Sequence, residues 1–230
     1  MSQRVVIIGA GGHGQVVADI LWQMRVAGLD VTPIGYLDDN LLLAGQRFQD
    51  VPVLGRVADL ASVPHDAVVV AVGDNATRRR LYGALAGRSE RMQICCHPRA
   101  VIAGGVSVGP GAMICAGVVI NPGSSVGANA ILNTGCTVDH HNRIGDHAHI
   151  APGVHLGGDV TIGEGALVGI GATVLPGRRV GDWSIVGAAS LLRRDLGAGM
   201  MAVGVPARAI PRRTSASEFP EQQVASTTMP

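Results

Sequence analysis

Aliphatic residues recur every six positions through the second half of the chain. Sixteen consecutive positions six residues apart, from Ile102 to Leu192, are all Val, Ile or Leu, without slip or insertion. Gly dominates the position three residues after each of them, and small residues or Val the position four after. Such a period is typical of a β-helix built from hexapeptides, three to a triangular coil. The pattern predicts a left-handed prism of about five coils with the aliphatic side chains inside, an exception to the usual right-handed crossover.

The first part of the chain has a different pattern. Short apolar runs at residues 5–8, 34–37 and 68–72 predict buried strands, and amphipathic stretches at 15–27 and 77–85 predict helices. Strand–helix alternation favours a small parallel α/β domain of Rossmann-like type. We expect this domain over residues 1–95, the β-helix over 96–210, and a polar, disordered tail over 211–230.

Composition excludes several classes of protein. The 230 residues include 33 Gly without a collagen period, and only six aromatic residues, so the core must be aliphatic. A net charge of +1 argues against a nucleic-acid partner. Four Cys without a CxxC pair suggest a reduced, cytoplasmic setting, and no apolar run is long enough to cross a membrane.

A glycine-rich motif joins the first strand to the first helix. Gly9–Gly14 fits G-x-G-x-x-G, which offers free helix N–H groups to a phosphate. Asp38 and Asp39 end the next strand, where a ribose-binding acid belongs. NAD binding is one interpretation, but no hydride-transfer domain follows, and a nucleotide-sugar diphosphate needs the same cradle. His13 inside the turn is unusual, and without a ligand it would be a plain helix-start residue.

Histidines interrupt the six-residue pattern in one stretch. His141 and His147 replace Gly in consecutive hexapeptides, and the same stretch adds other polar residues, namely Asp139, His140, Asp146 and His149. A solvated rim is the simplest interpretation. Zinc binding is a weaker one, because a three-His site needs a more distant ligand. General-base catalysis fits better, since imidazole titrates near neutrality. Cys136 falls in an inward phase and is expected in the core.

Several of these segments together resemble a known family. The matching segments are Gly9–Gly14 with His13, Leu37–Asp39, Val72–Asn75, His97–Pro98, Asn133–Thr134, Val138–His140, Ile144–Asp146 with His149, and Gly204–Ala207. They are similar to the bacterial sugar O-/N-acyltransferases of the left-handed β-helix superfamily. That group includes acetyltransferases of UDP-linked 4-amino-4,6-dideoxy sugars, GDP-perosamine N-acetyltransferases and sialic acid O-acetyltransferases.

The resemblance implies a set of site residues and partners. It implies acetyl-CoA as donor, no metal, and a homotrimer with active sites between neighbouring prisms. The catalytic set would be His140 as general base with His141 and Asp139. The acetyl-CoA set would be His149, Ile170 and Ala188, and the nucleotide-sugar set would be Gly11, Gly12, His13, Asp38, Asp39 and Gly73. The family usually has an acidic residue directly after the catalytic His, and here that residue is His141. Either Asp139 or Asp146 takes over its orienting role, or the base is weaker.

The expected function is acetyl-CoA-dependent N-acetylation of a UDP- or GDP-linked 4-amino-4,6-dideoxy sugar, by direct attack, in surface-polysaccharide biosynthesis. O-acetylation of a sugar hydroxyl is the alternative that the same base would serve. A non-catalytic nucleotide-sugar-binding scaffold and a zinc hydratase are two further alternatives. The sequence leaves the nucleotide base and the sugar open.

Overall fold

The N-terminal domain is a twisted sheet flanked by helices. The computed structural model describes residues 2–211. Its first elements are β1 (Gln3–Ile8), α1 (Gly12–Val26), β2 (Val31–Leu37), η1 (Leu41–Leu43), β3 (Arg47–Phe48), β4 (Val51–Gly55), η2 (Val57–Ser62), β5 (Ala67–Val70) and α2 (Asn75–Ala86). The sheet order is β3-β4-β2-β1-β5, parallel except for the β3–β4 hairpin. The carboxyl ends of β1, β2 and β5 therefore meet at one edge, where ligands of such sheets bind.

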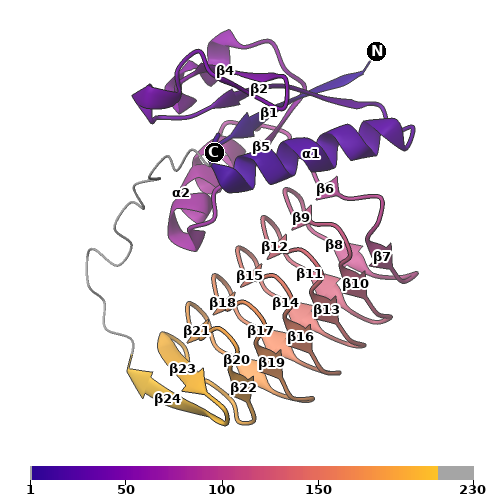
Figure 1. Ribbon diagram of the computed structural model, residues 1–230, viewed down its shortest axis with the longest axis vertical. Helices are drawn as coiled ribbons and strands as arrows, with labels where there is room; N and C mark the ends of the chain where they lie inside the picture. The colour runs from indigo at the N-terminus through magenta and orange to yellow at the C-terminus, as the bar shows by residue number, and fades with distance from the viewer. Residues whose placement is uncertain (1, 212–230) are drawn as a thin grey trace, which may run out of the picture.

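Burial explains the central strands and the position of α1. Val5–Ile8 of β1 are fully buried, as a continuous apolar run in a parallel sheet should be. Helix α1 lies between the sheet and the first coil of the prism (Figure 1), and its apolar residues share one core with both. The two parts of the chain are thus joined by packing as well as by the backbone.

The prism follows the six-residue period. Each strand from β7 to β22 has two residues, and the second is the aliphatic residue of the period. The strands are β6 (Cys95–Cys96), β7 (Val101–Ile102), β8 (Ser107–Val108), β9 (Met113–Ile114), β10 (Val119–Ile120), β11 (Ser125–Val126), β12 (Ile131–Leu132), β13 (Thr137–Val138), β14 (Arg143–Ile144), β15 (His149–Ile150), β16 (His155–Leu156), β17 (Thr161–Ile162), β18 (Leu167–Val168), β19 (Thr173–Val174), β20 (Arg179–Val180), β21 (Ile185–Val186), β22 (Leu191–Leu192), β23 (Met200–Gly204) and β24 (Ala207–Pro211).

These strands form three walls. The first wall runs β7-β10-β13-β16-β19-β22, the second runs β8-β11-β14-β17-β20, and the third runs β6-β9-β12-β15-β18-β21-β23-β24. Pairing is parallel, and the β23–β24 hairpin, which is antiparallel, closes the third wall. The hexapeptide prediction is therefore confirmed. Pairing begins with β6 at Cys95, and the predicted tail lies outside the described residues except for Pro211.

Every corner of the prism needs a left-handed residue. The fifteen positions from 105 to 189 in steps of six all have φ between 53° and 81°. Nine of them are Gly, which adopts this conformation without a Cβ clash. The other six are Asn129, His141, His147, Asp159, Trp183 and Ala189. A non-glycine residue held there costs about 1–3 kcal/mol, so such residues need a local reason.

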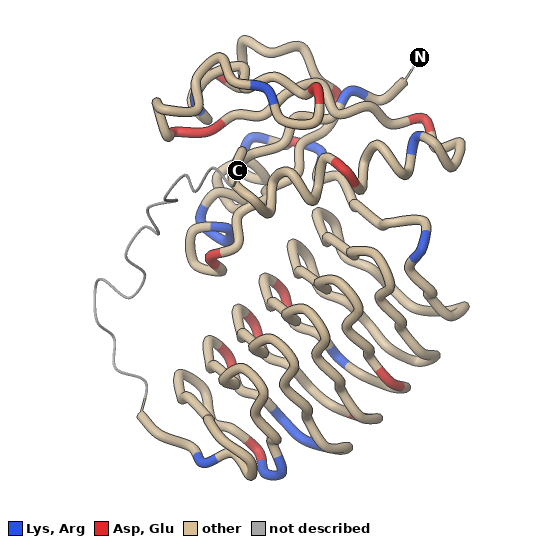
Figure 2. Tube along the Cα trace, viewed as in Figure 1, with Lys and Arg blue, Asp and Glu red and all other residues tan. Residues whose placement is uncertain are grey.

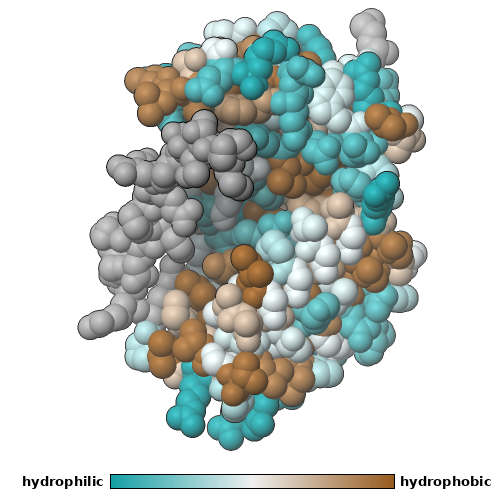
Figure 3. Space-filling model, viewed as in Figure 1, coloured by the Kyte–Doolittle hydropathy of each residue, from teal (hydrophilic) through white to brown (hydrophobic). Residues whose placement is uncertain are grey.

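The surface differs between the two parts of the chain. Charged residues are sparse along the coils, apart from acidic residues that follow one edge (Figure 2). Apolar side chains gather on the lower part of the face shown in Figure 3. Ile170, at the corner between the third and first walls, is 62% exposed.

Neither helix among residues 2–211 is long and apolar enough to span a membrane.

Candidate active site

The glycine-rich loop is open toward solvent. A Cβ on Gly14 would lie 2.1 Å from the Gly9 carbonyl oxygen, so the tight turn demands glycine there. Gly11 and Gly12 are exposed, and a Cβ on either would contact nothing within 4 Å. Gly11 caps α1 without a side-chain hydrogen bond. The first N–H groups of the helix are thus accessible to an anion.

The two aspartates after β2 have different roles. Asp38 uses both carboxylate oxygens locally: Oδ2 accepts from the Ala10 N–H at 2.7 Å and Oδ1 from the Asn40 N–H at 2.8 Å. It therefore braces the glycine-rich loop. Asp39 has a side chain that is 61% exposed, with Oδ1 accepting from the Val57 N–H at 3.1 Å. Its second oxygen has no hydrogen bond to the described residues.

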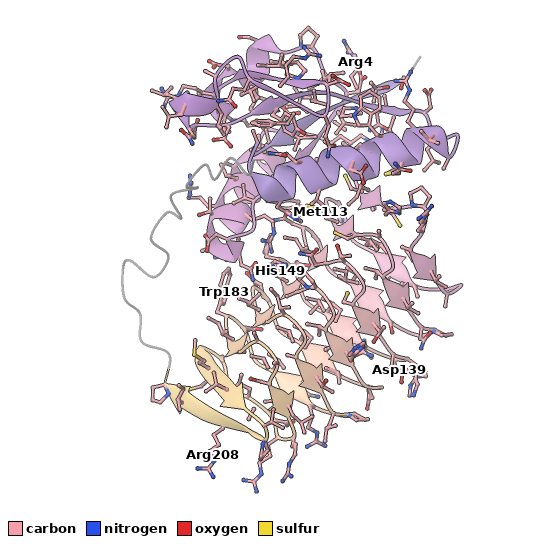
Figure 4. The ribbon with its side chains drawn as sticks, viewed as in Figure 1. Arg4, Met113, Asp139, His149, Trp183 and Arg208 are labelled. Carbon is pink, nitrogen blue, oxygen red and sulfur yellow. The ribbon has the colours of Figure 1, made fainter. Side chains whose placement is uncertain are left out.

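His13 and His149 meet where the two domains join. Their ring centroids are 6.4 Å apart, and Figure 4 shows His149 on the side of the prism beneath the N-terminal domain. The His149 ring hydrogen-bonds the backbone of Gly73, and its Nε2 lies 3.3 Å from Nδ2 of Asn133. Nε2 of His13 is buried without a partner among the described residues. A polar ligand between the domains would satisfy it.

Burial and a nearby cation keep both imidazoles neutral. Desolvation, with the Arg78 guanidinium adding repulsion, lowers the pKa of His13 to about 4. Desolvation, Arg78 and His13 lower the pKa of His149 to about 3, against a smaller opposing effect of the Gly73 hydrogen bond. At neutral pH neither ring carries a charge, so each is a hydrogen-bonding group and not a cationic acid.

His140 stands on another part of the prism. It lies at the corner between β13 and β14, exposed, with its Nδ1 3.0 Å from Nδ1 of His141. A Cβ on Gly158 would lie 2.4 Å from Cε1 of His140, so this glycine makes room for the ring. Asn142 donates to the carbonyl oxygens of Asp139 and Gly157 and fixes the corner.

Neither carboxylate considered from sequence orients the His140 ring. Oδ1 of Asp139 accepts from the His140 main-chain N–H and from Asn121, both at 2.8 Å. Oδ1 of Asp146 accepts from the Ala128 N–H at 2.7 Å. The ring partner of His140 is the His141 imidazole. Asp139 thus holds the main chain of His140 and has no hydrogen bond to its ring.

The histidine-rich stretch does not form one cluster. His140 and His141 lie between the first and second walls, whereas His149 lies on the third, and Figure 4 shows Asp139 and His149 at opposite edges. His147 is 9% exposed, accepts at Nδ1 from Asn129, and contacts Tyr82 edge-on at 5.4 Å. Its departure from glycine therefore serves domain packing. Ile170 and Ala188 lie at the corner between the third and first walls.

The comparisons with known proteins agree with this architecture. Residues 4–85 match the PglD N-terminal domain. GDP-perosamine N-acetyltransferase from Caulobacter crescentus, in complex with CoA and GDP-perosamine, is 36% identical with a TM-score of 0.82, over 90% of this chain and 97% of that one. The acetyltransferase domain of PglB from Neisseria gonorrhoeae, with acetyl coenzyme A, is 32% identical with a TM-score of 0.85, over 91% and 100%. The chain belongs to the left-handed β-helix sugar N-acetyltransferases.

Other comparisons add to the description of this sugar N-acetyltransferase. WeeI from Acinetobacter baumannii is 27% identical with a TM-score of 0.81, over 90% of this chain and 99% of that one. A comparison with curated proteins finds no significant match. The predictions of an acyltransferase and of acetyl-CoA as its co-substrate are confirmed at the level of the family. Among residues 2–211, no three His, Cys, Asp or Glu side chains gather as a metal site.

The cysteines of this sugar N-acetyltransferase are unsuited to carry an acyl group. Cys115 and Cys136 are buried, and desolvation raises the pKa of each thiol to about 12. Burial also raises the pKa of Cys95 and Cys96. Because the thiolate is the nucleophile, burial disfavours the reactive form of all four thiols. The core position predicted for Cys136 agrees with its complete burial.

Sequence reasoning missed one residue at the junction of the domains, Arg78. It lies in the first turn of α2 and begins an Arg-Arg-Arg run, which in a sequence is typical of a solvated helix face. In the structure Arg78 is fully buried. The only signal of its role is its distance of a few residues from the Val72–Asn75 motif.

Proposed function

We propose that this protein transfers the acetyl group of acetyl-CoA to the amino group of a UDP- or GDP-linked 4-amino-4,6-dideoxy sugar. The observation that carries the proposal is the junction of the open glycine-rich loop with two neutral histidines, His13 and His149. The relative from Caulobacter crescentus, crystallised with CoA and GDP-perosamine, supports the same class of substrate. Free cysteines favour the reducing cytoplasm as the setting.

The N-terminal domain would hold the acceptor by its nucleotide. The exposed backbone at Gly11 and Gly12 would take the diphosphate at the start of α1. Asp39, with one unengaged carboxylate oxygen, suits a ribose hydroxyl better than Asp38, which is committed to the loop. Gly73 and His13 would line the path of the sugar toward the prism, where Nε2 of His13 needs a partner.

The contact between His140 and His141 supports the general-base role. Only one of the two Nδ1 atoms can carry a hydrogen in a neutral pair. When His140 donates from Nδ1 to His141, its Nε2 lone pair is exposed and able to accept a proton. His141 then accepts the hydrogen bond that the family usually gives to a carboxylate. An imidazole has no negative charge, so it stabilises the protonated base less than a carboxylate does.

The active site would be shared between copies of the chain. Within one chain, His140 lies at the corner between the first and second walls, whereas His149 lies on the third wall beneath the N-terminal domain. A homotrimer of prisms side by side would bring His140 of one copy to the edge of the next, where His149, Ile170 and Ala188 lie. The strongly exposed Ile170 at that edge is suited to contact a neighbour or the pantetheine arm.

The reaction would be a direct transfer. The amino nitrogen attacks the thioester carbonyl while His140 takes its proton, and the C–S bond breaks to release CoA as the thiol. A backbone N–H or neutral His149 would stabilise the oxyanion. Fixing acceptor and donor in one groove supplies much of the rate, since effective molarity is worth about 7–11 kcal/mol in well-oriented systems.

A substrate panel tests the proposal. UDP- and GDP-linked 4-amino-4,6-dideoxy sugars and their 4-hydroxy counterparts are incubated with acetyl-CoA, and free thiol release is measured. We expect release with at least one amino sugar and none with its hydroxy counterpart. Release with only the hydroxy sugars would instead assign O-acetylation. Absence of release together with absence of acetyl-CoA binding by calorimetry would favour a binding scaffold.

A further inference from the structure

Arg78 is a buried cation that forms no ion pair with a carboxylate of residues 2–211. Its side chain is 0% exposed. Nε donates to the Asn129 carbonyl at 3.0 Å, Nη1 to Val72 at 3.0 Å and Gly73 at 3.2 Å, and Nη2 to His147 at 2.6 Å and Ala148 at 3.4 Å. A guanidinium has five N–H donors, and here each has a carbonyl acceptor. No other side chain supplies that planar set of five, and lysine supplies three.

The five acceptors belong to both halves of the site. Val72 and Gly73 form the loop after β5, which is proposed to hold the acceptor sugar. His147 and Ala148 are the two residues before His149, the first residue of β15. The His149 ring itself hydrogen-bonds the Gly73 backbone. One side chain therefore fixes the acceptor loop against the strand that carries the donor-side histidine.

Strained corners of the prism face the same helix. Asn129, His147 and Trp183, three of the six non-glycine residues with left-handed backbone, lie in one column 18 residues apart or a multiple of it. Each contacts α2: Asn129 Nδ2 bonds the Arg78 carbonyl at 3.3 Å, His147 meets Tyr82, and Trp183 lies under Arg79 at 5.5 Å. Backbone strain that is retained at three corners of one column indicates that the packing position of α2 on the prism is closely specified.

We propose that Arg78 is a positioning residue for acetyl transfer, which holds the Val72–Gly73 loop in register with His149. The inference rests on the proposed function, because it assumes that this loop carries the acceptor. The charge of Arg78 also lowers the pKa of His149, His13 and His147, and the Asp74 carboxylate acts on Arg78 in the opposite direction. The hydrogen bonds of the guanidinium thus fix the strand that carries His149, and its charge lowers the pKa of the His149 ring.

Kinetics of Arg78→Lys test the geometric role. The variant keeps the charge and loses two donors, so the loop and the strand lose their common anchor. We expect kcat to fall about 10- to 100-fold and KM for the nucleotide sugar to rise, since displacements near 1 Å have such effects. Arg79→Ala is the matched control, because Arg79 is the next residue of α2. This change removes the ion pair with Glu164 at 3.0 Å and the contact with the Trp183 ring, both of which lie on the prism. We expect it to leave kcat and KM unchanged. A lower melting temperature for Arg78→Lys with wild-type kcat and KM would overturn the proposal.

The His149 ring gives a readout that needs no turnover. Its resonance, assigned with His149→Gln, is followed by NMR during pH titration of the wild type and of Arg78→Met. Removing the guanidinium is expected to raise the pKa of His149, and an unchanged titration would overturn the electrostatic part. Titration of the wild type with UDP or GDP is expected to shift the same resonance. Nucleotide binding without such a shift would overturn the proposed coupling between the Val72–Gly73 loop and His149. This measurement needs no Arg78 variant, so it holds even if none of the variants folds. If the wild type transfers no acetyl group, the proposed function fails separately from these ring measurements.

Discussion

Replacing His140 with Ala is expected to lower kcat by about 10²- to 10⁴-fold, the usual contribution of a general base. The side chain is exposed, and among residues 2–211 its ring hydrogen-bonds only His141, so the prism loses no core contact. The melting temperature should stay close to that of the wild type. Steady-state thiol release and thermal unfolding of the same preparation measure both. Wild-type turnover in His140→Ala would remove this histidine from the mechanism.

Gly158→Ala provides a milder version of the same change. The new methyl group would meet Cε1 of His140 at 2.4 Å, so the exposed ring must turn away while it keeps its chemistry. We expect a smaller loss of kcat than in His140→Ala. Gly104→Ala is the matched control, because it lies on the same corner of the prism and a Cβ there contacts nothing within 4 Å. Equal activity of Gly158→Ala and Gly104→Ala would show that the position of the His140 ring is unimportant for turnover.

Acidification is expected to destabilise the protein from pH 6.5 down to about pH 3. The folded-state pKa values of His13 and His149 are about 4 and about 3, below the 6.5 of an unfolded histidine. The unfolded chain therefore binds more protons in this range, and the free energy of unfolding falls as the pH falls. A folded-state pKa that lies one pH unit below the unfolded value corresponds to about 1.4 kcal/mol. The two buried imidazoles together therefore contribute several kcal/mol, fully present above pH 6.5.

Urea unfolding at a series of pH values measures this effect. A His13→Asn, His149→Gln double variant lacks the two groups but keeps the carboxylates, which also titrate in acid. We expect the wild type to lose stability more steeply than the double variant from pH 6.5 downward. Parallel curves for the two proteins would contradict the burial of neutral imidazoles at the domain junction.

The repeat made most of the prism predictable from sequence. Each aliphatic position became the second residue of a strand, and the positions three residues later, from 105 to 189, became left-handed corners. The hairpin β3–β4 was missed, because two short strands with Pro52 carry little periodic signal. The wall on which each histidine lies follows from the period, because residues 18 apart share a wall.

The contacts between the two domains could not be predicted from the sequence pattern. His147 breaks the repeat as clearly as His141 does, yet it serves packing against Tyr82, some 65 residues earlier in the chain. Arg78 lies in a run of arginines that predicts a solvated surface, and only the tertiary structure buries it. Asp38 occupies the position of a ribose-binding acid, but the turn of the loop draws its carboxylate to Ala10.

Mixing two inactive variants tests most directly whether the active site joins two copies of the chain. His140→Ala and His149→Ala subunits are co-expressed or refolded together in equal amounts, with each variant alone as control. A site built from His140 of one copy and His149 of the next is intact wherever a His149→Ala subunit, which keeps His140, is followed by a His140→Ala subunit, which keeps His149. Random assembly into a cyclic oligomer then restores about a quarter of the wild-type activity. A mixture no more active than the separate variants would contradict a shared site.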